Sequence, residues 1–190
     1  MPLATYIIFG SWGVFIAVWI VGALGAKRDI GRSWWQRWWL SRIVLILALW
    51  GIIDAFMGAT RRPFDWTYSL HTGMALINTG AVLTALGIAY AVWARVYLGT
   101  NWSGTPALKE KHELVTSGPY ALVRHPIYTG MLVAIFGSAL ASPLWFVVFI
   151  AAAAVFVRRI GIEEKLMMKT FPNEYPAYKK RTWALVPWVW

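Results

Sequence analysis

The sequence predicts an all-α, polytopic membrane protein with about five transmembrane helices. This prediction rests on its composition, its long apolar runs and its charge distribution. Of the 190 residues, 59% are hydrophobic and only 14% are charged, whereas an average soluble domain has roughly 25% charged residues. Fourteen tryptophans suit a chain that meets the membrane–water interface repeatedly. The chain has no cysteine, which excludes disulfides, thiolate metal sites and a cysteine nucleophile.

Three apolar runs occupy the first half of the chain, at residues 5–25, 43–58 and 70–93. The first contains no charged residue and has the length of a membrane span, which needs about 20 residues. No positive charge precedes it, so we expect a retained span, with a cleaved signal peptide as the alternative. In the third run, Gly73, Gly80 and Gly87 recur at seven-residue intervals, which predicts a helix face that packs closely against a neighbour.

The fourth and fifth runs, 127–141 and 144–157, are separated only by Ser142 and Pro143. Each could form a helix of about 22 Å, which is shorter than the roughly 30 Å hydrocarbon core. We therefore expect a tight hairpin whose two helices extend beyond the apolar runs on the cytoplasmic side, with Pro143 in the first turn of the returning helix. A re-entrant hairpin is the alternative.

The basic residues are distributed unevenly. Every Lys and Arg except Arg61 and Arg62 lies in the linkers after the first and third runs or in the tail after the fifth. By the positive-inside rule, this pattern predicts five spans with the N-terminus outside and the C-terminus in the cytoplasm. The tryptophan-rich segment 34–39 would then form an interfacial anchor, or a short helix lying on the anionic leaflet.

Polar residues that could support chemistry collect in segments 101–128 and 158–181, which the hairpin should bring together. Arg124 and His125 precede Pro126, which suits the first position of a helix. Such a helix N-terminus could hold a carboxylate or phosphate, although Arg and His are also ordinary interface residues. Arg159 and Glu163 share a helix face, either as a solvated salt bridge or as a carboxylate offered to a cationic ligand.

Two motifs in these segments carry a family resemblance. Segment 112–128, HELVTSGPYALVRHPIY, resembles the core of the isoprenylcysteine carboxyl methyltransferase family, a phospholipid methyltransferase-like group of integral membrane enzymes. The later signature of that family follows the hairpin, as Glu163, Glu164, Phe171, Glu174, Tyr175, Tyr178 and Pro187. The resemblance covers about residues 95–190. It divides the chain into three N-terminal transmembrane helices (1–94) and a catalytic region with a cytoplasmic cofactor pocket (95–190).

The resemblance implies a methyltransferase that uses S-adenosylmethionine and methylates a lipophilic acceptor such as a prenylated cysteine carboxylate. By resemblance, the cofactor contacts would be His112, Glu113, Leu114, Val115, Tyr120, His125, Pro126, Ile127, Tyr128 and Glu163. The catalytic residues would be Arg159, Glu163 and Arg124, with Arg159 near the methyl acceptor. Membrane lipids are the expected surroundings, and neither a metal nor a nucleic acid is expected.

The nature of the acceptor is less constrained than the cofactor. The residues around Thr105 depart from the cofactor contact of eukaryotic members, and five spans are fewer than many of those members have. A phospholipid amine or a small thiol is therefore an alternative acceptor. A related membrane reductase that uses NADPH is a further alternative, because sterol reductases have a similar C-terminal fold. A scaffold or transporter is disfavoured, because the sequence contains no internal repeat.

Overall fold

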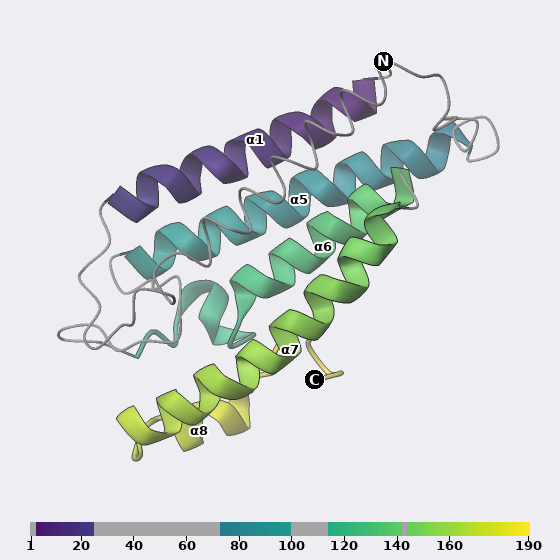
Figure 1. The fold of residues 1–190 in the computed structure, drawn as a ribbon. Helices are drawn as coiled ribbons and strands as arrows, with labels where there is room; N and C mark the ends of the chain where they lie inside the picture. Colours follow the sequence, from purple (N-terminus) through teal and green to yellow (C-terminus); the bar gives the residue numbers. More distant parts are fainter. Residues whose placement is uncertain (1–2, 25–72, 100–113, 142–143) are drawn as a thin grey trace.

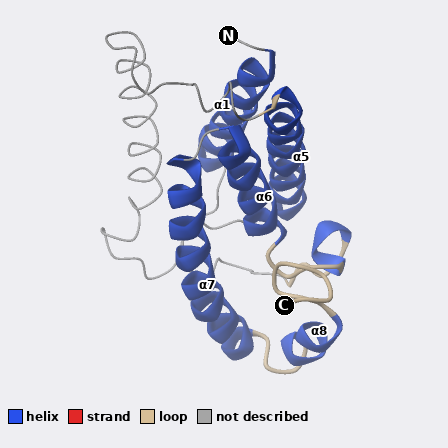
Figure 2. Cartoon of the chain, turned by 90° about the vertical axis from the view of Figure 1, so that its right-hand side faces the viewer, coloured by secondary structure: helices blue, strands red, loops and turns tan. Residues whose placement is uncertain are grey.

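The computed structural model describes residues 3–24, 73–99, 114–141 and 144–190, and these parts are helical with connecting loops (Figures 1 and 2). Their elements are α1 (Leu3–Leu24), α5 (Met74–Leu98), the 3₁₀ helix η2 (Gly118–Ala121), α6 (Pro126–Ala141), α7 (Leu144–Thr170) and α8 (Tyr175–Arg181). The predicted second span, the tryptophan-rich segment and the Ser142–Pro143 turn lie outside the described residues.

Three described helices are long and apolar enough to cross a membrane: Leu3–Gly22 of α1, Met74–Leu98 of α5 and Trp145–Thr170 of α7. Helix α6 is also apolar but has only 16 residues. The prediction of an all-α integral membrane protein is thereby confirmed. The count of five spans stays a prediction, because its second run is not among the described residues.

Helices α1 and α5 run in parallel. Near their N-terminal ends, Ala4 and Ile8 of α1 form a buried cluster with Ile77 and Ala81 of α5. At the opposite ends, the Arg95 guanidinium donates hydrogen bonds to the carbonyls of Gly22 (2.8 Å) and Gly99 (3.0 Å). A cation there complements the negative ends of both helix dipoles.

Helices α5 and α6 pack backbone to backbone along glycines. A Cβ atom on Gly87 would lie 2.6 Å from the Gly130 carbonyl oxygen, and a Cβ atom on Gly137 would lie 2.6 Å from the Gly80 carbonyl oxygen. The predicted close packing is therefore confirmed for Gly80 and Gly87. Gly73 lies just before α5, and no atom of the described residues lies within 4 Å of its Cβ position. It is therefore not part of this contact.

Helix α7 continues well beyond its apolar run. Residues 158–170, the α7 extension, add more than three turns beyond the apolar run and lead to α8 (Figure 1). These turns contain the charged residues Arg159, Glu163 and Glu164. Helix α6 begins at Pro126, as the position of this proline predicted, but it extends only one residue beyond its apolar run, so the predicted cytoplasmic extension of this helix is wrong. Proline restrains the preceding residue away from helical geometry, so α6 cannot readily extend further.

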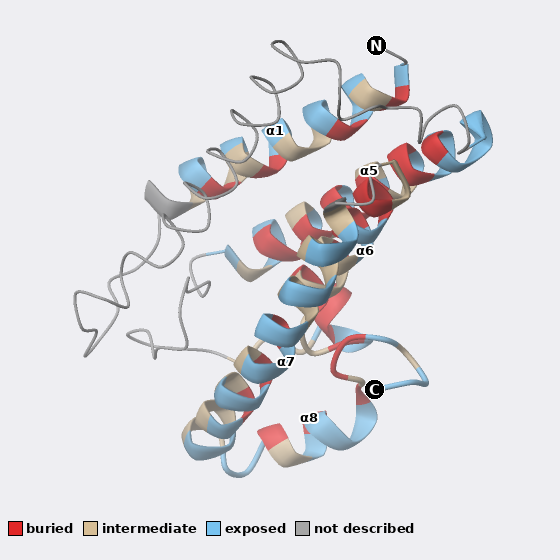
Figure 3. Cartoon of the chain, turned by 45° about the vertical axis from the view of Figure 1, so that its right-hand side comes forward, coloured by how far each residue is buried: buried red, intermediate tan, exposed pale blue. Residues whose placement is uncertain are grey.

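The C-terminal strap (residues 182–190) returns from α8 to the start of α6. Trp183 pairs with Val123 in an isolated parallel β-bridge. The strap carbonyls of Trp183 and Ala184 accept hydrogen bonds from the N–H groups of Arg124 (2.8 Å) and His125 (3.1 Å). Figure 3 shows buried positions concentrated between α5 and α6, whereas exposed positions predominate on α7. In the strap, Thr182, Ala184 and Leu185 are buried and the last residues are exposed.

Candidate functional site

Charged side chains converge where the start of α6 meets the α7 extension. His125 Nδ1 lies 3.5 Å from Glu163 Oε2, so the predicted juxtaposition of these two residues is confirmed. It follows from the hairpin, because the two residues lie at similar chain distances on either side of its turn. Six residues form this charged cluster: Arg124, His125, Arg159, Glu163, Glu164 and Lys179.

Glu163 is held by two donors at one oxygen. Its Oε1 accepts a 2.6 Å hydrogen bond from the Tyr128 hydroxyl and another of 2.6 Å from Arg159 Nε. Arg159 and Glu163 are one helical turn apart on α7, as their spacing predicted. Only 20% of the Glu163 side chain is exposed. The ion pair is therefore not the solvated one that the alternative interpretation required.

Aromatic rings form a column beside this ion pair. The Tyr128 ring stacks on His125 with 5.7 Å between centroids, and on Phe156 with 4.7 Å. The Arg159 guanidinium carbon lies 5.6 Å from the Tyr128 ring centroid, within the range of a cation–π contact. Phe156, Arg159 and Glu163 follow one another at spacings of three and four residues. One face of α7 therefore supplies all three.

Glu164 faces a different set of partners, because consecutive helical residues point about 100° apart. Its Oε1 accepts a 2.7 Å hydrogen bond from Arg124 Nε, and its Oε2 lies 2.5 Å from Lys179 Nζ on α8. The same Oε1 lies 3.7 Å from His125 Nε2. The two adjacent glutamates thus contact the two ring nitrogens of His125, and Glu164 also forms an ion pair with Lys179 of α8.

His125 is buried between the two carboxylates, with 10% of its side chain exposed. Burial disfavours the imidazolium, but the nearby carboxylates of Glu163 and Glu164 outweigh that effect and raise the pKa of His125. Among the described residues, the buried Nε2 atom has no hydrogen-bond partner within bonding distance. The site therefore favours a protonated histidine, whose buried Nε2 atom faces Glu164 without a hydrogen bond to any described residue.

The other predicted cofactor residues are less closely grouped. Ile127 and Tyr120 belong to an apolar cluster with α1 and α5, against which Val115 packs. The Tyr120 hydroxyl lies 3.3 Å from the Ala94 carbonyl and so points into the helix bundle. Pro126 is buried at the start of α6, and Leu114 is half-buried. His112 and Glu113 lie outside the described residues.

Sequence reasoning assigned no site role to Glu164, Lys179 or Phe156. The helical spacing of Phe156 from Arg159 could have identified it as part of the same face. Glu164 was recognised only as part of a motif, and no pattern in the sequence indicates which partners it faces. Lys179 joins the cluster through the folding back of α8, which no local spacing predicts.

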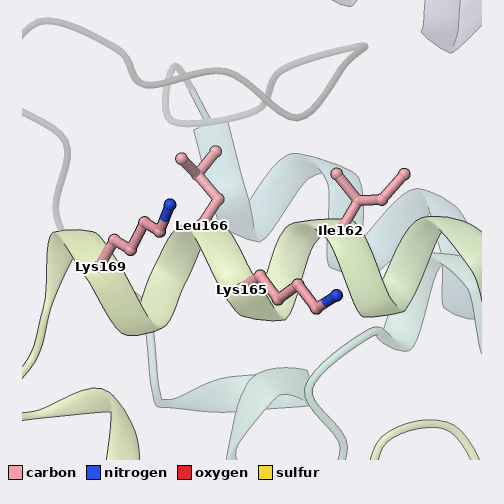
Figure 4. Close-up of a pocket in the computed structure, with 4 residues that line it drawn as sticks. All are labelled: Ile162, Lys165, Leu166 and Lys169. Atoms are coloured by element: carbon pink, nitrogen blue, oxygen red, sulfur yellow. The ribbon is translucent and has the colours of Figure 1, made fainter.

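A shallow hollow of about 230 Å³ opens on a neighbouring face of α7, lined by Ile162, Lys165, Leu166 and Lys169 (Figure 4). Its lining contains none of the clustered side chains. The charged cluster is closed by its own ion pairs, so a ligand that binds there must exchange some of these contacts for its own.

Comparisons with known proteins match this part of the chain. The phospholipid methyltransferase family profile matches residues 75–174. The protein-S-isoprenylcysteine O-methyltransferase of Saccharomyces cerevisiae is 30% identical over 143 residues, which are 73% of this chain and 59% of the yeast protein. The cobalt-zinc-cadmium resistance protein CzcN of Cupriavidus metallidurans is 28% identical over 150 residues, which are 74% of this chain and 63% of CzcN.

A solved structure also resembles the fold. The eukaryotic intramembrane Ras methyltransferase ICMT matches with a TM-score of 0.55 and 26% identity, over 66% of this chain and 49% of that protein. The chain spans about three fifths of the length of the two relatives named above. The resemblance recognised in the sequence is confirmed by these matches.

Proposed function

Because the chain belongs to the phospholipid methyltransferase family, we propose that it is an integral membrane methyltransferase. Its methyl donor would be S-adenosylmethionine, and its acceptor a lipophilic group such as a prenylated cysteine carboxylate. The observation that carries this proposal is the contact between His125 and Glu163, within the matched residues 75–174. The names of the yeast relative and of the structural neighbour support the choice of acceptor.

The charged cluster suits the amino-acid end of this cofactor. Glu163 would accept the ammonium group, and His125 with the N-terminus of α6 would hold the carboxylate. The buried Nε2 atom of His125, which has no hydrogen bond to any described residue, supports this assignment. S-adenosylmethionine supplies a methyl group on a cationic sulfur. Tyr128 and Arg159 would lie beside this methyl group and the acceptor.

The protein would contribute mainly by positioning the reactants and excluding water. Arg159 would orient an acceptor carboxylate, because a guanidinium binds carboxylate oxygens in a fixed geometry. Arg124 contacts Glu164 and α8 and so would act through them. Following the family motif, the remaining proposed cofactor contacts are His112, Glu113, Leu114, Val115, Tyr120, Pro126, Ile127 and Tyr128.

The two regions of the chain would have different roles. Residues 1–94 would anchor the protein, and residues 95–190 would form the catalytic region. With the N-terminus outside and the C-terminus in the cytoplasm, the cofactor would enter from the cytoplasm and the lipophilic acceptor from the bilayer. The excess of basic residues in the linkers and tail supports this orientation.

Isothermal titration of the detergent-solubilised protein with S-adenosylhomocysteine tests the cofactor. We expect binding by the wild-type protein and none by the Glu163→Ala or His125→Ala variants. Absence of binding by the wild type would refute the proposal, and stabilisation by NADPH alone would favour the reductase alternative. A labelled methyl donor offered with prenylcysteine analogues, phospholipids and alkyl thiols would then identify the acceptor.

A further inference from the structure

We propose that Glu164 is a positioning residue, which fixes α8 and the C-terminal strap against His125 rather than contacting cofactor or acceptor. This inference rests on the proposed function, since it concerns how that site is held in place. It starts from the two adjacent glutamates of α7, whose contacts differ. Glu163 meets Tyr128 and Arg159, whereas Glu164 meets Arg124 and Lys179.

The first step runs from Glu164 to the end of α8. Arg124 Nε donates to Glu164 Oε1 over 2.7 Å. The Nη1 atom of the same guanidinium donates to the backbone carbonyls of Lys179 and Thr182. These carbonyls lie at the C-terminal end of α8, where a cation is favourable. Lys179 Nζ, on the same helix, donates a hydrogen bond to Glu164 Oε2. Glu164 therefore neutralises the two cations that hold this helix end.

The second step runs from α8 along the strap to His125. The Trp183 carbonyl accepts a hydrogen bond from the Arg124 N–H, and the Ala184 carbonyl accepts one from the His125 N–H. The Trp183 N–H in turn donates to the Leu122 carbonyl over 3.2 Å. Further on, the Thr129 hydroxyl donates to the Leu185 carbonyl over 2.8 Å. The strap thus provides hydrogen bonds for the backbone that enters α6, and this backbone sets the position of His125.

Burial makes this arrangement sensitive to the loss of one charge. The Arg124 and Glu164 side chains are 9% and 11% exposed. Removing one partner of a buried ion pair leaves the other charge without compensation, which costs far more than removing an exposed pair. We therefore expect a substitution at Glu164 to loosen α8 and the strap, with a smaller effect at the half-exposed Lys179.

The test combines a structural readout with a functional one. Limited trypsin digestion of the full-length protein in detergent, followed by mass spectrometry, measures cleavage after Arg181 at the end of α8. We expect cleavage about tenfold faster in Glu164→Gln than in the wild type. Lys179→Gln should show a smaller increase. The matched control Lys180→Gln, on the exposed side of α8, should be cleaved at the wild-type rate.

The functional readout is the pH dependence of S-adenosylhomocysteine affinity. His125 faces the carboxylates of Glu163 and Glu164 and stacks on Tyr128. Because protonated His125 would hold the cofactor carboxylate, affinity should fall as the pH rises and His125 loses its proton. Removing the negative charge of Glu164 should shift this fall to lower pH, while binding itself persists. If the substitution only loosened the fold, affinity would fall by a similar factor at every pH.

The possible outcomes separate the two proposals. If Glu164→Gln abolishes binding at every pH but is cleaved like the wild type, Glu164 is a ligand contact and the positioning role is wrong. Wild-type cleavage together with a wild-type pH profile would also overturn it. If the wild-type protein does not bind S-adenosylhomocysteine, the proposed function fails, and the cleavage rates still decide whether Glu164 holds the strap. Should Glu164→Gln not fold, the comparison of Lys179→Gln with Lys180→Gln decides.

Discussion

The hydroxyl of Tyr128 donates a 2.6 Å hydrogen bond to Glu163 Oε1, joining the first turn of α6 to the α7 extension. Arg159 Nε donates to the same oxygen, also over 2.6 Å. One carboxylate oxygen therefore fixes two helices whose charged ends form the site. The second oxygen lies beside His125 Nδ1. This carboxylate is already oriented before any ligand arrives, as a preorganised site requires.

Replacing Tyr128 by Phe tests this link. The variant keeps the ring that stacks between His125 and Phe156, but it removes the hydroxyl that orients Glu163. Because a hydrogen bond to a charged group contributes about 1.5–3 kcal/mol, affinity for S-adenosylhomocysteine should fall by about tenfold or more. Titration calorimetry measures this change. Tyr97→Phe removes an exposed contact with Ser117, away from the charged cluster, and should bind normally.

Replacing Arg159 by Lys tests whether geometry as well as charge matters there. Lysine keeps the cation but loses the planar fork that binds a carboxylate and contacts Glu163. We expect kcat/KM for a carboxylate acceptor to fall by about tenfold or more. Arg158→Lys changes the adjacent, exposed arginine and should retain the wild-type kcat/KM. Equal activity of the two variants would contradict the role proposed for Arg159.

Stability should depend on the protonation of His125. Its pKa is raised in the folded protein because Glu163 and Glu164 outweigh the effect of burial. The protonated form therefore stabilises the fold fully below the pKa of the unfolded chain, about 6.5, and this contribution is lost as pH rises through the folded pKa. Thermal unfolding in detergent from pH 6 to pH 9 should show a falling Tm. In His125→Gln this fall should be smaller, and an equal fall would contradict the prediction.

The contact between α5 and α6 requires glycine at specific positions. A Cβ atom on Gly130 would lie 2.6 Å from the Gly87 carbonyl oxygen and 2.7 Å from the Ala91 nitrogen, both of them backbone atoms. Gly130→Ala should therefore destabilise the protein by about 1–3 kcal/mol. Gly161→Ala, in α7 with no described atom within 4 Å of its Cβ position, should stabilise it by about 0.5–1 kcal/mol. Thermal unfolding of both variants measures the contrast.

The sequence by itself determined the spans at α1, α5 and α7 and the meeting of His125 with Glu163. Apolar runs and proline positions are local signals, and a two-residue connection leaves the hairpin little freedom in how its ends meet. The same local signals explain why the predicted extension of α6 beyond its apolar run is wrong. The run was short, and the preceding Pro126, rather than the apolar pattern, decided where the helix begins.

Only the tertiary structure decided which partners each charged residue has. Arg124 reaches Glu164 across 40 residues and the Thr182 carbonyl across 58. The Tyr120 hydroxyl points into the bundle toward the Ala94 carbonyl, a contact that no spacing in its motif predicts. Such choices depend on how α7 is rotated and on where α8 folds back. These are set by the packing of many side chains at once, and no spacing along the chain encodes them.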